Sequence, residues 1–140
     1  MMRYLAQLPI WRSANRLLLE IEQGVRGFSR YHKYTIGHHL RETAMRICQA
    51  LHRAFSRRNS QIKMVQQVAE LIDDIKMQIQ LAKELHAFHS FAQFQRVAEL
   101  AVAVALGKQA DGWLKQVRAE VRRYQHAARD SIHCAPTSPQ

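Results

Sequence analysis

The 140-residue chain is poor in residues that cross-link or interrupt a fold, with two cysteines, three prolines and five glycines. Cys48 lies in an amphipathic stretch and Cys134 near the C-terminal end, so no disulfide framework is indicated. This cysteine usage is typical of a reduced, cytoplasmic protein. So few turn-forming residues also exclude a sandwich or barrel of many short strands. We therefore expect one helical domain, located in the cytoplasm.

Long hydrophobic runs are also missing. The most apolar run, Val97–Leu106, has ten residues and includes Glu99, whereas a membrane-spanning helix needs about 20. The N-terminal segment has an apolar run too short for a secretory signal, and Glu20 and Glu22 follow in the same amphipathic stretch. We therefore expect this segment to be a helix of the mature domain, and we expect no membrane partner.

Acidic residues are scarce, since 11 Asp and Glu stand against 21 Lys and Arg, which gives a net charge of +10. Residues 1–58 hold 11 of the basic residues and three of the acidic ones, whereas residues 59–90 hold three and four. Such an excess predicts a polyanionic partner, nucleic acid more often than an anionic membrane. The alternative is a solvated helix surface whose charge only aids solubility.

Apolar residues recur at spacings of three and four through most of the chain, which predicts amphipathic helices over residues 9–28, 36–57, 61–87 and 91–124. The third pattern, from Val65 to Ala82, is the most regular. Short linkers make neighbouring helices antiparallel. The fold class expected is therefore all-α, an up-down-up-down antiparallel four-helix bundle over residues 1–128, with a disordered tail over residues 129–140.

Three local signals place the helix starts. Pro9 suits the first position of a helix, because its missing N–H would be unpaired there in any case. Thr35 is placed to cap the second helix. The spacing of Ser90 and Gln93 is that of a capping box for the fourth helix.

Arginines form the main candidate binding surface. On a helical wheel, Arg46, Arg53 and Arg57 fall within about 40° of one another, opposite the core stripe of the second helix. Arginine outnumbers lysine, which favours fork-like contacts to phosphate. The residues expected to contact nucleic acid are Arg26, Arg30, Lys33, Arg41, Arg46, Arg53, Arg57, Arg58, Lys115, Arg118, Arg122 and Arg123.

Aromatic and basic residues alternate in the linker between the first two helices, where the sequence reads FSRYHKY over residues 28–34. Aromatic rings beside cations can stack on unpaired bases. The same pattern also fits a second interpretation, in which Phe28 and Tyr34 close the end of the bundle. The sequence leaves both open.

No constellation of residues indicates catalysis. The pairs His38–His39 and His86–His89 have no carboxylate or cysteine at a companion spacing, so no metal site and no other cofactor is expected. Cys48 lies on the apolar side of the second helix, where a small buried thiol is more common than a nucleophile. We therefore expect a protein that is not an enzyme.

The apolar run in the fourth helix predicts self-association. Its side chains point in most directions, and a helix that is apolar nearly all round is buried nearly all round. We expect a second subunit to cover part of it, so that the protein forms a homo-oligomer. The alternative is a kinked helix that packs on its own core. The expected subunit contacts are Val97, Leu100, Val102, Val104 and Leu106.

Two short motifs carry a resemblance to a known family. YTIGHHLR, over residues 34–41, resembles the "Y-T-L-G-x-x-L-R" that opens the second helix in one four-helix-bundle family. GKQADGWLK, over residues 107–115, resembles that family's "G-K-x-x-G-G-W-L/I-K" near the end of the fourth helix. The similarity extends from about Trp11 to Arg118. One departure is Phe28-Ser29, where the family often has Phe-Pro.

This family contains the accessory variability determinant (Avd) proteins of diversity-generating retroelements and the proteins encoded within bacterial 23S rRNA intervening sequences. The resemblance to Avd implies a small basic homopentamer that binds the retroelement's reverse transcriptase and its template-repeat RNA or cDNA. Such a protein supports mutagenic cDNA synthesis without catalysing a reaction itself. The intervening-sequence relatives imply the alternative, an RNA-binding or protein–protein scaffold with the same fold.

Overall fold

The computed structural model describes residues 8–56 and 61–110, together with residues 122, 123, 126, 127 and 129. Within these residues all regular structure is helical and no strand is present, which confirms the all-α prediction. Four helices are long and one has a single turn. They are α2 (Pro9–Arg26), α3 (Arg30–Lys33), α4 (Ile36–Ser56), α5 (Gln61–Glu84) and α6 (Phe91–Ala110).

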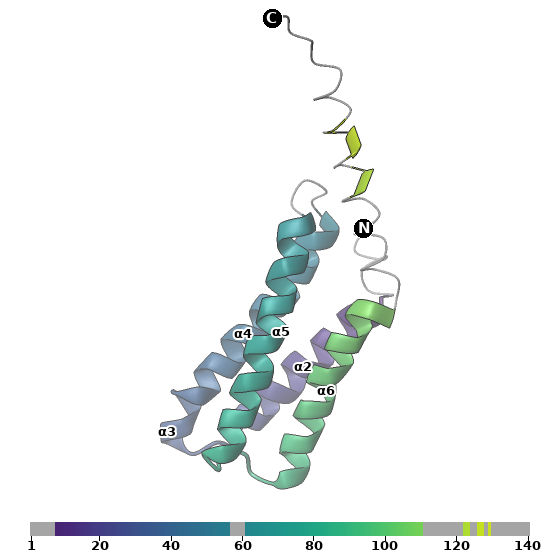
Figure 1. Cartoon of the computed structure of the whole chain (residues 1–140). Helices are drawn as coiled ribbons and strands as arrows, with labels where there is room; N and C mark the ends of the chain where they lie inside the picture. The colour runs from purple at the N-terminus through teal and green to yellow at the C-terminus, as the bar shows by residue number, and fades with distance from the viewer. Residues whose placement is uncertain (1–7, 57–60, 111–121, 124–125, 128, 130–140) are drawn as a thin grey trace, which may run out of the picture.

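The long helices form a bundle around one apolar core. Helix α2 packs against α4 and α6, and α5 packs against the same two helices (Figure 1). Side chains with almost no exposure come from all four, as Leu17, Leu40, Ile75 and Val97 illustrate. The short helix α3 lies at one end of the bundle, between α2 and α4. The coarse prediction of a helical bundle is therefore confirmed.

The boundaries of α2 follow local backbone chemistry. Pro9 occupies the first turn, as predicted. The helix ends at Arg26 rather than residue 28, because the N–H groups of Gly27 and Phe28 bond to the carbonyl oxygens of Gly24 and Val25. These tight bonds close the last turn and direct the chain into α3.

Helix α5 buries the regular stripe that the sequence indicates, since Val68, Ile72, Ile75, Ile79 and Ala82 are all in the core. It ends at Glu84 rather than residue 87. A Schellman motif ends it: the His86 N–H bonds to the Lys83 oxygen at 3.0 Å and the Ala87 N–H to the Ala82 oxygen at 2.9 Å. His86 takes the left-handed position of this motif, with φ at 57°.

The linker predicted over residues 29–34 contains a helix instead. Ser29 caps α3, because its Oγ accepts a bond from the His32 N–H at 3.4 Å. The Thr35 hydroxyl donates to the Tyr31 oxygen at 2.8 Å. Thr35 precedes α4 as predicted. Its side chain was expected to cap α4, but it bonds to the backbone of α3 instead.

The start of α6 matches the predicted capping box. Ser90 Oγ accepts from the Gln93 N–H at 3.1 Å, and Gln93 Oε1 accepts from the His89 N–H at 3.1 Å. The Gln93 side chain also lies against Gly24 of α2, where an added Cβ would be 3.4 Å from Gln93 Cδ. The part of the predicted fourth helix that follows Ala110 lies outside the described residues, except for isolated positions.

Gly37 allows α4 to begin in close contact with α2 and α3. A Cβ at this position would lie 2.8 Å from Val25 Cγ1 and 2.9 Å from the His32 oxygen. The second of these atoms belongs to the backbone, which cannot move aside as a side chain can. Gly37 therefore fixes how closely α3 packs on the start of α4.

Candidate nucleic-acid interface

The predicted basic residues lie on several helices. Arg41, Arg46 and Arg53 are exposed on α4, while Arg26 is exposed at the end of α2. On α3, Arg30 is exposed and Lys33 is half-buried; Arg122 and Arg123 are helical and exposed. The positions that lie outside the described residues are Arg57, Arg58, Lys115 and Arg118.

Two of the α4 arginines already have acidic partners. Arg41 Nε lies 2.7 Å from Glu22 Oε1 on α2, and Arg46 Nη2 lies 2.6 Å from Glu42 Oε1 one turn away. Glu42 also lies 3.4 Å from Nε2 of His38. Exposed ion pairs of this kind contribute about 0–1 kcal/mol each, so a phosphate group can compete for the arginine. The arginine surface of α4 is nevertheless less positive than its arginines alone indicate, because Glu22 and Glu42 lie against it.

Four further candidate cations have no such partner in the described part of the chain. Arg26, Arg30, Lys33 and Arg53 form no ion pair with any described residue. Three of them belong to the end of the bundle formed by the last turn of α2 and by α3. Part of the available positive charge therefore lies beside α3, with Arg53 further along α4.

The aromatic residues around α3 separate into two groups. Phe28 is buried and packs edge-to-face on Phe88, with ring centroids 5.3 Å apart. Tyr31 and Tyr34 are 75% and 71% exposed. Phe28 therefore closes the end of the bundle, as one interpretation of the sequence predicts, whereas Tyr34 does not.

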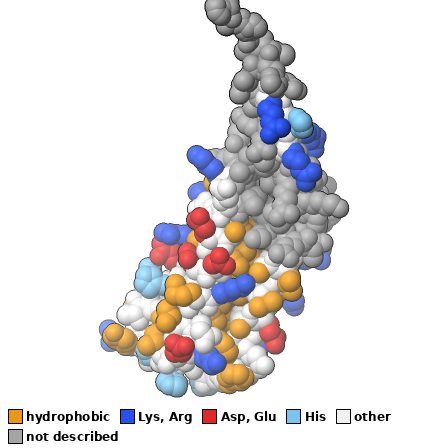
Figure 2. Space-filling model, in the orientation of Figure 1, with side chains coloured by type: hydrophobic (Ala, Val, Ile, Leu, Met, Phe, Trp, Pro, Cys, Tyr) orange, Lys and Arg blue, Asp and Glu red, His pale blue; other side chains and the backbone are white. Residues whose placement is uncertain are grey.

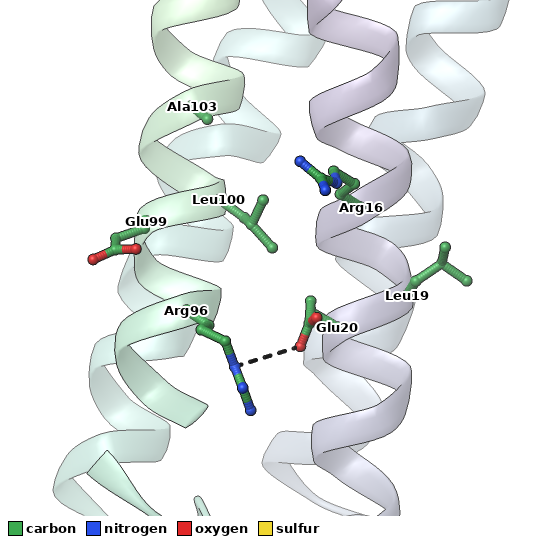
Figure 3. A pocket seen from close by; sticks show the side chains of 7 residues that line it. All are labelled: Arg16, Leu19, Glu20, Arg96, Glu99, Leu100 and Ala103. Carbon is green, nitrogen blue, oxygen red and sulfur yellow. Dashed lines mark ion pairs between the residues drawn. The ribbon is translucent and has the colours of Figure 1, made fainter. Parts of the chain in front are cut away.

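A groove of about 520 Å³ lies between α2 and α6. Arg16 and Glu20 point into it from α2, and Arg96 and Leu100 point into it from α6 (Figure 3). Arg96 Nε lies 3.9 Å from Glu20 Oε2. The lining is completed by Leu19, Glu99 and Ala103. Figure 3 shows Glu99 pointing away from α2, so two arginines and one glutamate point into the groove. No pattern within a single helix could have indicated this groove.

The side chains of the apolar residues that were expected to contact another subunit do not all point in the same direction. Val97 and Val104 are 0% exposed and belong to the bundle core, so the expectation is corrected for these two residues. Val102 and Leu106 are 48% and 58% exposed, and Leu100 is half-buried in the groove. Most of the apolar side chains of α6 therefore pack inside the bundle. Only those on the outer side of the helix are available to another molecule.

The Cys48 thiol is buried and donates a weak hydrogen bond to the Ala14 oxygen at 3.7 Å. Burial raises its pKa to about 11, because the thiolate would be poorly solvated there. A neutral, enclosed thiol is unsuited to act as a nucleophile.

Among the described residues, no group of three or more His, Cys, Asp or Glu side chains could hold a metal ion. His38 and His39 lie with ring centroids 5.8 Å apart and both are exposed. None of the described helices combines the length and apolar character needed to cross a bilayer.

The chain matches no known protein family and no curated protein. The resemblance to Avd and intervening-sequence proteins therefore rests on the two motifs alone. The structure gives one residue of the first motif a physical role, because Gly37 permits the close contact between α4 and α3. The second motif lies outside the residues whose side chains are described.

Proposed function

We propose that the protein is a non-catalytic, RNA-binding accessory protein of a diversity-generating retroelement, which binds the reverse transcriptase and the template RNA to support mutagenic cDNA synthesis. The observation that carries the RNA-binding part is the exposed cationic surface of α2, α3 and α4. The motifs at residues 34–41 and 107–115 support the retroelement part.

The charge arrangement favours phosphate over a chemically specific ligand. Arg26, Arg30 and Arg53 are exposed and have no ion pair with a described residue. Guanidinium groups bind phosphate oxygens in a fork and release counterions from the nucleic acid. Binding of this kind is strong at low salt and nearly independent of base sequence.

Assembly is part of the same proposal. An up-down-up-down bundle that closes into a homo-oligomeric ring, with five copies as the family resemblance implies, would carry a total charge of roughly +50. Val102 and Leu106 lie one turn apart on the outer side of α6 and offer apolar surface for the subunit contact. Repeated weak phosphate contacts around a ring would act together as one high-affinity site.

A salt titration tests the RNA-binding part. If about five phosphates of a single strand are contacted, log K plotted against log salt should have a slope of about −3.5. Replacing Arg46, Arg53 and Arg57 by Glu should abolish binding while the helical circular dichroism is unchanged. A flat salt response, or a triple variant that binds like the parent, would contradict the proposal. Reverse transcription by a retroelement reverse transcriptase, with and without the protein, tests the retroelement part.

The second candidate function is a protein–protein scaffold of the intervening-sequence type. One observation favours it: Met77 and Leu81 on α5 and Leu85, directly after its end, are exposed at spacings of four residues. They lie on the segment with almost no net charge. An exposed apolar strip of this spacing suits a partner helix. Absence of RNA binding, together with capture of a protein partner that Leu81→Glu abolishes, would favour this function.

A further inference from the structure

We propose that α3 presents a platform on which unpaired bases stack, so that the preferred ligand is single-stranded RNA. We call this surface the α3 platform, and it consists of Arg30, Tyr31, Lys33 and Tyr34. The inference rests on the proposed RNA-binding function and adds the kind of strand and the point of contact.

The first argument is the exposure of the two tyrosines. Tyr31 and Tyr34 are the most exposed large hydrophobic side chains of the described residues, although Phe28, only three residues before Tyr31, is buried. A folded chain usually covers aromatic rings, and exposed rings beside cations are typical of binding surfaces. Tyrosine rings can stack on any base, because every base has a π face.

The second argument is the rigidity of the backbone that carries the rings. The Thr35 hydroxyl holds the Tyr31 oxygen at 2.8 Å, and Ser29 caps the preceding turn. The Tyr31 ring lies edge-to-face on His32, with centroids 5.5 Å apart, and the His32 oxygen lies against Gly37. A platform held in place from both sides loses little conformational entropy when a ligand binds.

The third argument is the charge around the rings. From Gln23 to Arg41 the sequence contains no acidic residue, and it contains Arg26, Arg30 and Lys33. Figure 2 shows hydrophobic, basic and histidine side chains close together at the end of the molecule where α3 lies, with an acidic side chain nearby. Cations flanking a ring can hold the phosphates on either side of a stacked base.

These features together select single strands. In a duplex the bases are paired and stacked on one another, so a tyrosine on a convex helix cannot reach their π faces. Arginines alone would bind both forms through phosphate. The α3 platform should therefore add affinity for unpaired bases without altering the affinity for duplex RNA.

The experiment compares three variants of the full-length protein with the parent by fluorescence anisotropy. The probes are a labelled uridine 12-mer and a 12-base-pair RNA duplex. Tyr31→Ala with Tyr34→Ala removes both rings, Tyr31→Phe with Tyr34→Phe keeps them, and Leu19→Ala removes an exposed side chain on α2 as a control. We expect the double alanine variant to lose at least about tenfold in affinity for the uridine strand. The phenylalanine variant and the control should bind it like the parent, and duplex binding and the salt slope should be unchanged in all.

Each other outcome overturns a different statement. If the parent binds the uridine strand and the double alanine variant binds it equally well, the α3 platform is wrong and the proposed function stands. If the alanine and phenylalanine variants lose affinity equally, the hydroxyl groups act and stacking is refuted. If the parent binds neither probe, both the proposed function and the platform fail. Thermal unfolding of each variant verifies that the bundle is intact.

Discussion

Arg41 Nε on α4 lies 2.7 Å from Glu22 Oε1 on α2, across 19 residues of sequence. This contact joins two helices that carry candidate arginines and occupies one of those arginines. Glu22 therefore lowers the positive potential that a phosphate meets beside Arg41.

Replacing Glu22 by Gln should strengthen RNA binding. The variant frees Arg41 and removes a negative charge from the surface, so we expect an affinity about two- to fivefold higher at low salt. Stability should change by less than about 1 kcal/mol, because the pair is exposed. Glu70→Gln, which removes the same charge from α5, is the matched control. An equal gain in both variants would mean that net charge acts alone and that Arg41 is not at the interface.

Charge substitutions on α6 should separate packing from assembly. Val102→Glu places a carboxylate on the outer side, so the protein should remain folded but form a smaller assembly in sedimentation equilibrium. Val104→Glu should unfold the bundle, because the cost of an unpaired buried charge exceeds about 4 kcal/mol. Met77→Glu, at an exposed position of α5, should leave the assembly intact. A parent protein that is monomeric at micromolar concentration would refute the predicted assembly.

Gly37→Ala should destabilise the bundle by about 1–3 kcal/mol, because the new methyl group meets Val25 and the His32 carbonyl at less than 3.0 Å. Gly27→Ala is the control, since its Cβ would lie at an ordinary 3.5 Å from the Gly24 oxygen and its φ is −85°. Urea unfolding of both variants measures the difference. Equal stability of the two would show that α3 adjusts at no cost.

His86→Gly should stabilise the protein by about 0.5–1 kcal/mol, because glycine takes the left-handed conformation without a steric penalty. His86→Ala keeps the Cβ in the same strained position and should give no gain. Thermal unfolding of the two variants against the parent provides the comparison. If alanine stabilises as much as glycine, the left-handed backbone is not the source of strain.

The Cys48 thiol should make stability depend on pH in the alkaline range. Its pKa rises from an ordinary 9.0 to about 11 on folding, so above pH 9 the unfolded chain loses a proton that the folded chain keeps. The contribution of the protonated thiol to the free energy of unfolding is therefore fully present below pH 9. It falls by up to about 2–3 kcal/mol as the pH approaches 11. Urea unfolding of the parent and Cys48→Ala should show the difference between them shrinking with pH. A constant difference would contradict the assignment.

Sequence periodicity predicted the parts of the fold that depend on local chemistry. The stripe of α5, the proline at the start of α2 and the capping box of α6 each involve residues within a few positions of one another. Helix α3 was missed because one turn is too short to show a period. In α6, valine and alanine occupy most sides of the helix, so the sequence alone did not separate buried Val104 from exposed Val102.

The candidate site was less accessible to sequence reasoning, because its properties depend on contacts between helices. The described basic candidates are exposed except for half-buried Lys33, and their contact with nucleic acid stays a prediction. The pairing of Arg41 with Glu22 could not be predicted, because it requires α2 and α4 to be placed together. The two possible roles of the tyrosine-rich linker were separated only by burial, since Phe28 and Tyr34 are both aromatic.

Gln93 links the formation of two helices to each other. Its Oε1 accepts the His89 N–H at the start of α6, while its side chain rests on Gly24 near the end of α2. The side-chain position that completes the cap is thus supported by a neighbour nearly 70 residues earlier in the chain. The first turn of α6 should gain its full protection from hydrogen exchange only together with the last turn of α2, so that the two open as a single cooperative unit.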